Sequence, residues 1–263
     1  MKASMWKRDY RLDQMDLKEL TRAYLLYPDI QIYFILGAIS TYVAYVLGTN
    51  ILPLIAAAAA MVVIYPLFWY VLHRFVLHGK YLYKSKYTSS LWKRIHFDHH
   101  RDPHDLQVLF GALHTTLPTL ALVSMPLGYV IAGYAGAAAG FASSIFTTCF
   151  YEYIHCIQHL NFQPRSKILQ RVKRLHLQHH FHDETANYGI TNFVPDRLFG
   201  THKPSVKGRP RSETVFNLGY TKDEVSKYPW VAQFTHDLDV ETASREGIDR
   251  RKPTRDTTSN KAA

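Results

Sequence analysis

The sequence predicts an all-α integral membrane protein with four transmembrane helices in two hairpins and a helical, histidine-rich cap on the cytoplasmic side. Two blocks contain no Lys, Arg, Asp or Glu, Ile30–Leu72 and Leu106–Tyr151. Each is long enough for two membrane helices of about 20 residues. Ten of the 15 histidines lie in four clusters beside these blocks. A soluble protein with a large helical core is the alternative, and two uncharged blocks of this length disfavour it.

The first segment, residues 1–29, alternates in charge and lacks the apolar core of a secretory signal. Asp16 and Glu19 have the spacing of a capping box, which predicts a short helix that starts at residue 17. We expect this helix to lie on the membrane surface before the first span. Its apolar face consists of Leu17, Leu20, Tyr24 and Tyr27.

Each uncharged block contains a turn signal. Gly48-Thr49-Asn50 divides the first block and Gly133-Tyr134-Ala135-Gly136 divides the second, so each block predicts a helical hairpin. The expected spans are residues 30–48, 51–72, 112–133 and 136–156.

Charge predicts the orientation of these spans. The formal charge is +10, from 31 basic and 21 acidic residues, and no Lys or Arg lies in either hairpin. By the positive-inside rule, we expect both termini and the loop 74–105 on the cytoplasmic side. Topology and anionic lipid headgroups explain the basic charge better than a nucleic acid does, so no nucleic-acid partner is expected.

Two cap helices are expected, over residues 89–100, before Pro103, and over 166–180. Residues 202–263 form a polar C-terminal segment, disordered over 247–263, so the membrane-embedded domain comprises 30–201. An apolar patch is expected to dock on that domain: Val215, Phe216, Leu218, Tyr228, Trp230, Val231 and Phe234.

Cys149 and Cys156 are interpreted as small buried residues rather than a disulfide.

The four histidine clusters predict a metal site. Residues three or four apart share a helix face, and adjacent histidines in the H-x2-H-H clusters can serve different ions. His73 and His78 are five apart, so the helix has to end or distort between them. Ten imidazoles exceed the four ligands of a zinc site, which predicts two ions. The candidate ligands are His73, His78, His96, His99, His100, His155, His159, His176, His179 and His180.

Two hydrolytic functions are disfavoured, because the chain lacks their motifs. The chain has no H-E-x-x-H, the pattern of zinc proteases. It also has no G-x-S-x-G, the pattern of serine lipases.

The clusters and the residues after them carry a family resemblance. The boxes are H-x4-H at His73, H-x2-H-H at His96, E-x2-H-x3-H at Glu152 and H-x2-H-H at His176. They are followed by Asn187-Tyr188-Gly189-Ile190-Thr191 and Asp196-Arg197-Leu198-Phe199-Gly200-Thr201. Over roughly residues 65–201 the chain resembles the superfamily of fatty acid hydroxylases and sterol desaturases, and within it the fatty acid 2-hydroxylases.

This resemblance implies a lipid-hydroxylating monooxygenase with two iron ions and O2 as co-substrate. Imidazole suits iron, whereas zinc, which competes for the same ligands during purification, has no redox chemistry. The expected substrate is an acyl lipid from the bilayer, hydroxylated near its carboxyl end. Because 29 residues precede the first span, electrons are expected from a separate ferredoxin or haem carrier.

Two departures keep other substrates open. Pro195 stands where the family pattern has tryptophan, and Asn187-Tyr188-Gly189 resembles the sterol-desaturase form. A sterol- or carotenoid-type hydroxylase or desaturase is therefore an alternative. A non-enzymatic metal-binding membrane protein is a further one, although the spans lack the ionisable midplane residues of a transporter.

Several polar residues near the boxes have less certain roles. Glu152 is expected to orient a ligand imidazole through a hydrogen bond, with a structural ion pair as the alternative. Asp196 is expected to do the same or to cap a turn. Asp98 and Asp105 share that ambiguity. His104, His114, His182, His202 and His236 lie outside the matched pattern.

Overall fold

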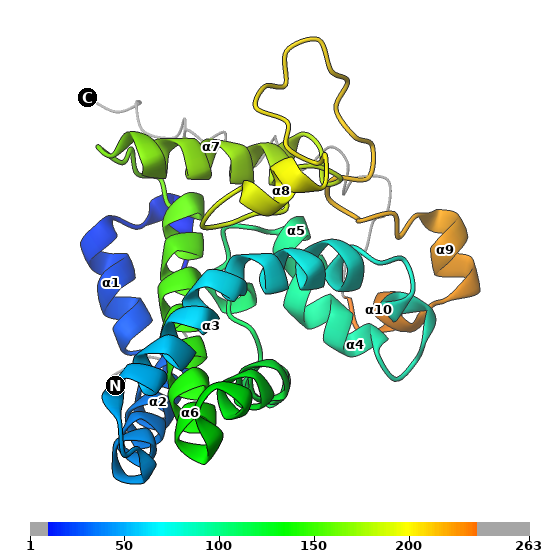
Figure 1. Cartoon of the computed structure of the whole chain (residues 1–263). Helices are drawn as coiled ribbons and strands as arrows, with labels where there is room; N and C mark the ends of the chain where they lie inside the picture. Colours follow the sequence, from blue (N-terminus) through cyan, green and yellow to red (C-terminus); the bar gives the residue numbers. More distant parts are fainter. Residues whose placement is uncertain (1–9, 236–263) are drawn as a thin grey trace, which may run out of the picture.

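The computed structural model describes residues 10–235, which form helices joined by loops. Three long apolar helices, α2 (Pro28–Leu47), α3 (Ile51–Val71) and α6 (Leu113–His159), gather at one end of the molecule (Figure 1). Helix α1 (Leu17–Leu25) flanks α6. The other end is a helical cap, made of α4 (Ser89–Trp92), α5 (Asp98–Arg101), α7 (Lys167–Phe181), α8 (Val194–Leu198), α9 (Lys222–Lys227) and α10 (Trp230–Gln233).

The predicted capping box at the start of α1 is confirmed. The Asp16 side chain accepts from the Glu19 backbone N–H, and the Glu19 side chain accepts from the Asp16 N–H. We expected the apolar face of this helix to lie on the membrane surface. In the structure this face packs against α6. Its Tyr24 hydroxyl donates to the carbonyl oxygen of Cys149 at 2.5 Å. The N-terminal segment is therefore anchored to the body of the protein.

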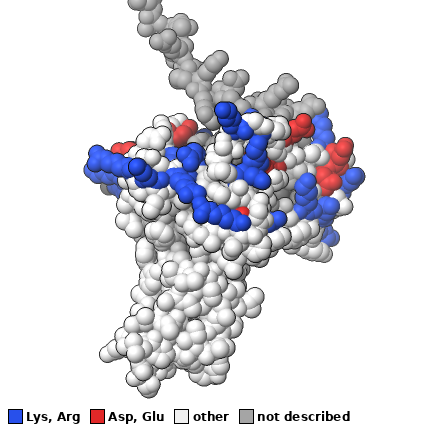
Figure 2. Space-filling view, turned by 45° about the horizontal axis from the view of Figure 1, so that its top comes forward, with Lys and Arg blue, Asp and Glu red and all other residues white. Residues whose placement is uncertain are grey.

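The three long helices have the length and composition to cross a membrane. Their outer surface carries apolar side chains that are more than half exposed, such as Val63 at 77% and Leu122 at 78%. A continuous apolar surface of this kind marks contact with lipid rather than water. Figure 2 shows the same region as an uncharged stalk below a charged head. The chain is a multi-pass membrane protein.

The two helices of the first hairpin begin and end close to the residues that the sequence predicts. Helix α2 has Pro28 in its first turn, where the missing N–H needs no partner. The chain turns at Gly48-Thr49-Asn50, and the Asn50 side chain accepts from the Leu52 N–H at 3.0 Å to cap α3. The predicted spans 30–48 and 51–72 therefore match α2 and α3 to within two residues.

Helix α6 reverses direction at Ala132–Gly133, the two residues with non-helical torsion angles. Gly133 has φ of 60°, a conformation that glycine adopts without steric strain. Its two halves then pack closely, because a Cβ atom on Gly128 would lie 2.2 Å from the carbonyl oxygen of Gly136. The break falls at the start of the predicted turn, because residues from Tyr134 onward are already helical.

The C-terminal segment packs on the cap as far as the structure describes it. Val215, Phe216, Leu218 and Val231 from the predicted apolar patch are buried, whereas Phe234 is 59% exposed. Leu218 and Val231 join a cluster with Tyr83, Trp92, Phe97 and Tyr220. The segment predicted to be disordered, 247–263, and His236 lie outside the described residues.

The close approach inside α6 gives a test of the hairpin. Replacing glycine by alanine inside a helix normally stabilises it by about 1 kcal/mol. We expect Gly128→Ala to do the opposite and destabilise the protein by roughly 1–3 kcal/mol, because the new methyl group forces two backbones apart. Thermal unfolding in detergent measures this, with Val130→Ala as control because Val130 is 84% exposed. An unchanged or raised melting temperature for Gly128→Ala would contradict the packed hairpin.

Candidate metal centre

A π-helical turn brings His73 and His78 together. The segment Leu72–Leu77 continues α3 as a π-helix, in which hydrogen bonds join residues five apart. The His78 N–H accordingly donates to the His73 carbonyl oxygen at 3.0 Å. The two Nε2 atoms lie 3.2 Å apart. The distortion that the five-residue spacing predicts is therefore confirmed: the turn is wider, and the helix ends at Leu77, directly before His78.

A second π-helical turn carries the next cluster. Lys93–Phe97 is π-helical and links α4 to α5, so residues 89–101 form one continuous helical segment that ends before Pro103. This confirms the predicted helix. The turn directs the Nε2 atom of His96 toward that of His78, at 2.8 Å.

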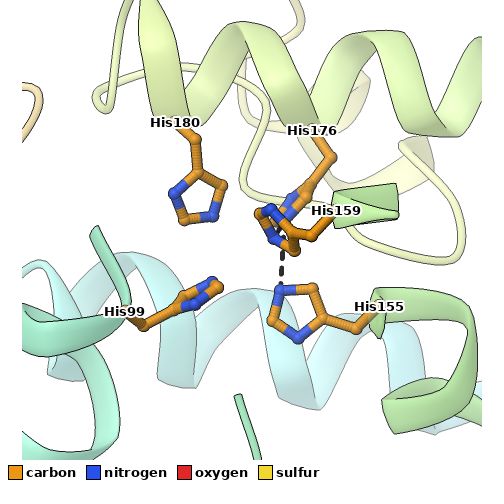
Figure 3. A group of neighbouring side chains, drawn as sticks. All are labelled: His99, His155, His159, His176 and His180. Carbon is orange, nitrogen blue, oxygen red and sulfur yellow. Dashed lines mark hydrogen bonds between the residues drawn. The ribbon is translucent and has the colours of Figure 1, made fainter. Parts of the chain in front are cut away.

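The end of α6 and the second half of α7 supply the other two clusters. His155 and His159, one turn apart on α6, both face His176 of α7. The Nε2 atoms of these two residues lie 3.1 Å and 2.9 Å from the Nε2 atom of His176. Figure 3 shows these side chains together with His180 above and His99 from α5 opposite.

Nine of the ten histidines gather in two adjoining groups, and the tenth, His179, lies between these groups with His100 and His180; no carboxylate belongs to any of these sets. In each group one nitrogen per ring lies within 4.8 Å of all the others. Adjacent histidines face different groups, as expected for the H-x2-H-H clusters, because His99 belongs to one group and His100 to the other. The first histidine group is His99, His155, His159, His176 and His180, and the second is His73, His78, His96 and His100. His179 lies between them, with ring centroids 4.9 Å from His73, 4.8 Å from His78 and 5.3 Å from His180.

Burial keeps these imidazoles neutral. It lowers the pKa of His100 to about 3, and it lowers the pKa values of His96, His99, His176, His179 and His180 well below the usual one. Neutral imidazole is the form that binds metals. The rings are therefore ready to act as ligands at any physiological pH.

Three rings are held by backbone carbonyl groups. The Nδ1 atom of His73 lies 2.6 Å from the carbonyl oxygen of Tyr188, that of His179 2.8 Å from Ala186, and that of His100 3.0 Å from Val215. A carbonyl oxygen only accepts, so each Nδ1 carries the proton and each Nε2 presents its lone pair.

The ring nitrogens opposite these bonds fit a metal ion. The Nε2 atoms of His100 and His179, and both ring nitrogens of His99 and His180, are buried without a hydrogen-bond partner in the described structure. A buried polar atom without a partner costs about 1–3 kcal/mol. Metal ions bound between the rings would satisfy these lone pairs, so the donor set suits imidazole-binding metals.

The sequence profile of the fatty acid hydroxylase family matches residues 58–201, more than half of the 263-residue chain. The chain belongs to the fatty acid hydroxylase family. All ten histidines of the two groups lie within the matched range.

Named relatives of this fatty acid hydroxylase support the assignment. A dihydroceramide fatty acyl 2-hydroxylase of Arabidopsis thaliana is 30% identical over 168 residues, which cover 64% of this chain and 68% of the relative. A ceramide very long chain fatty acid hydroxylase of Saccharomyces cerevisiae is 28% identical over 54% of this chain, and the fatty acid 2-hydroxylase of Mus musculus is 28% identical over 52%. The match spans only 36% and 38% of the lengths of those two relatives.

A solved structure has the same fold. In the structure of full-length scs7p only the hydroxylase domain is visible, and it matches 78% of this chain and 83% of its own with a TM-score of 0.60 at 21% identity. This fatty acid hydroxylase therefore shares the architecture of that domain.

Asp196 supports the second histidine group indirectly, through the loop that carries Tyr188. Its carboxylate accepts from the backbone N–H groups of Tyr188 and Gly189 at 2.8 Å each, and from the Thr201 hydroxyl at 2.8 Å. The carbonyl oxygen of Tyr188 in turn holds His73. Asp196 contacts a ligand candidate through the backbone and not directly, a connection that spacing alone did not reveal.

Glu152 has a different partner from the one expected. Its side chain is buried, and one oxygen accepts from the Gly111 N–H at 3.4 Å while the other has no hydrogen-bond partner among the described residues. No hydrogen bond to a histidine is present in the described part of the chain. Its predicted role in orienting an imidazole stays a prediction.

The remaining acidic residues act locally. Asp98 forms an ion pair with Lys93 at 2.7 Å. Asp105 accepts from the Gln107 N–H at 2.9 Å at the start of a short helical turn. Neither contact reaches a histidine of the two groups.

Two residues of the site were missed or undervalued in the sequence. The His104 Nδ1 atom lies 3.0 Å from the carbonyl oxygen of His159, so this histidine supports the end of α6. The Tyr188 ring packs edge-on against His73, His78 and His179. Its position within the family tail was the only available signal. By contrast His114 is exposed, and His182 and His202 are partly exposed outside both groups.

The Asp196 network gives a prediction about stability in this fatty acid hydroxylase. In Asp196→Ala two backbone N–H groups and one hydroxyl lose their buried acceptor, and we expect a loss of roughly 3 kcal/mol or more. Thermal unfolding measures it. Asp223→Ala is the control, because Asp223 is exposed in the first turn of α9 and should change stability by less than about 1 kcal/mol. Equal, small effects for both variants would contradict the described network.

Proposed function

We propose that this protein is a membrane di-iron monooxygenase that hydroxylates a fatty acyl chain near its carboxyl end. The observation that carries the proposal is the convergence of ten imidazoles at the ends of apolar helices, nine of them buried and the tenth, His78, partly exposed. Two relatives are named as fatty acyl or fatty acid 2-hydroxylases, which agrees with attack next to the carboxyl carbon.

The proposed ligand sets follow the two groups. One ion is held by His99, His155, His159, His176 and His180, and the other by His73, His78, His96, His100 and His179. Two iron ions bound there supply the redox chemistry that activates O2, which zinc lacks. Zinc is expected as a competitor for the same imidazoles during purification.

The chain's own residues orient and shield this site. Carbonyl groups of Tyr188, Ala186 and Val215 hold three rings with Nε2 directed inward. Asp196 fixes the loop that carries Tyr188, and the ring of Tyr188 covers the second histidine group. Val215 lies beyond the predicted 30–201 domain, so we propose that the functional unit includes part of the C-terminal segment.

The position of the site favours carbons near a lipid headgroup. His73 follows the end of α3, and His155 and His159 lie in the last turns of α6. A lipid whose chain lies beside these helices has its carboxyl or amide group at the same level as the histidines. This geometry supports hydroxylation near the carboxyl end over attack at mid-chain.

We also propose that the apolar helices make four spans, because α6 folds back on itself at Ala132–Gly133. Both ends of the described chain and the histidine-rich cap then lie on one side. By the positive-inside rule this is the cytoplasmic side, since Lys and Arg side chains gather on the charged head and not on the uncharged stalk (Figure 2).

Alanine substitutions test the proposed function. Replacing any of the ten histidines should abolish the hydroxylated lipid and lower bound metal below two ions per chain, because each ring fills a coordination position. Glu152→Gln should reduce turnover by about 10–100-fold, as loss of a partner near a metal site does. Mass spectrometry of lipids from cells with and without the protein detects the product as a gain of one oxygen atom. Elemental analysis gives the metal content.

His114→Ala and His202→Ala are the matched controls, because both residues lie outside the two groups. They should keep wild-type product and metal content. Full activity in His155→Ala or His179→Ala, or full activity with zinc alone, would refute the di-iron proposal. A gain of oxygen on sterols instead of acyl chains would refute the proposed substrate.

Labelling of single cysteines tests the topology. Cysteines at Thr49 and Tyr134, which are exposed in the two short turns, should react from the side opposite to cysteines at Tyr87 and Ser205. The native Cys149 and Cys156 are buried and give little background. Reaction of all four introduced cysteines from the same side is incompatible with four spans.

A further inference from the structure

Helix α7 has a basic outer face and a histidine-bearing inner face. Lys167, Arg171 and Arg174 follow one another at spacings of four and three residues, so they share a face, and all three are exposed. His176 and His180 are completely buried on the other side of the helix. An α-helix with its side chains is about 10–12 Å wide. The basic surface therefore lies one helix width from the first histidine group.

Among residues 10–235 no ion pair compensates the positive charge of this face, because the ion pairs there involve none of these three side chains. No acidic residue lies in α7, and Lys167 occupies the first turn, where the helix dipole disfavours a cation. Like charges three and four residues apart on a helix also repel. The pattern works against the stability of the helix, so a partner for it is the better explanation.

The basic surface continues onto α8. Arg197 of α8 is also exposed, and Phe193 at the start of α8 packs against Val172 and Leu175 of α7. Ile168 is 73% exposed next to Lys167. Arginine is enriched at protein interfaces, and three of the four basic residues of this surface are arginines. Figure 2 shows Lys and Arg side chains gathered on the head of the molecule.

The lipid bilayer is poorly placed to be the partner. Helix α7 lies at the end of the molecule opposite to the apolar ends of α2, α3 and α6 (Figure 1). Headgroups of the membrane that holds these helices therefore face other parts of the cap.

The proposed reaction requires a reductant. Hydroxylation of one C–H bond by O2 forms one C–OH bond and one water molecule, and it consumes two electrons and two protons. Nine of the ten histidines are buried and His78 is only partly exposed, so electrons have to enter across a protein surface. Complementary charge steers such encounters and raises the association rate.

We propose that the basic face formed by Lys167, Arg171, Arg174 and Arg197 is the docking surface for a small acidic one-electron carrier protein. This rests on the proposed function, because a redox reaction at the histidine groups is what requires the carrier. Two successive encounters deliver the two electrons, and the path from the surface to His176 crosses only α7.

Direct binding tests the docking surface independently of turnover. The iron-loaded protein in lipid nanodiscs is immobilised, and an acidic ferredoxin is passed over it at low and at high salt. We expect binding at low salt that weakens as salt screens the charges. The double variant Arg171→Glu/Arg174→Glu should reduce affinity by about tenfold or more, because steering contributes 10–1000-fold to such association rates. Cytochrome c, a basic carrier, should not bind.

The matched control is Lys86→Glu/Lys227→Glu, which changes the net charge equally at two exposed residues away from α7. It should keep wild-type affinity for the ferredoxin. Equal loss in both double variants would mean that net charge and not this face governs binding, and the proposal would be wrong. Loss of binding to vesicles of phosphatidylcholine and phosphatidylserine, with ferredoxin binding unchanged, would identify the face as a lipid contact instead.

A single turnover separates this proposal from the proposed function. The wild-type protein is reduced with dithionite, mixed with O2 and an acyl lipid, and assayed for hydroxylated lipid without any carrier. If no hydroxylated lipid forms while ferredoxin still binds in a salt-dependent way, the proposed hydroxylase function is wrong and the docking surface remains supported. Product formation with no ferredoxin binding would refute the docking surface alone.

Discussion

The structure depends on keeping ten imidazoles close together without a carboxylate among them. Burial makes the rings neutral, and neutral rings whose nitrogen lone pairs face one another at about 3 Å gain little from each other. Partnerless buried nitrogens then destabilise the folded state by an amount comparable to a lost hydrogen bond each. The surrounding protein has to hold the rings in place, and bound metal ions turn this unfavourable arrangement into a favourable one.

Two kinds of local structure meet this constraint. The π-helical turns at Leu72–Leu77 and Lys93–Phe97 add a residue to a helical turn, so that histidines with irregular spacing point into one volume. Backbone carbonyl groups from two loops, the one between α7 and α8 and the one that contains Val215, then fix the orientation of three rings. The helical segments that carry His73 and His100 are each tied to a loop 115 residues later, whereas His179 is tied to the loop directly after α7.

Much of this could be predicted from the sequence, because it follows from local patterns. The uncharged blocks gave the long apolar helices, the capping box gave α1, and the five-residue interval between His73 and His78 required a distorted helix. The supporting contacts could not be predicted. The carbonyl groups of Ala186 and Val215 carry no side-chain signal, and the link from Asp196 through Tyr188 to His73 depends on loop geometry. The role expected of Glu152 beside a histidine stays a prediction, and its contact with the Gly111 N–H likewise carries no sequence signal.

The contact between Val215 and His100 has a consequence for how the protein is made. The carbonyl group that orients His100 enters the chain 115 residues after the ring that it holds. While the ribosome is still adding the intervening residues, the membrane helices can already be inserted, yet the second histidine group lacks one of its supports. The nascent chain thus carries an incomplete and looser set of rings. The second histidine group gains its last backbone support only when the loop that contains Val215 has been made and has packed against His100.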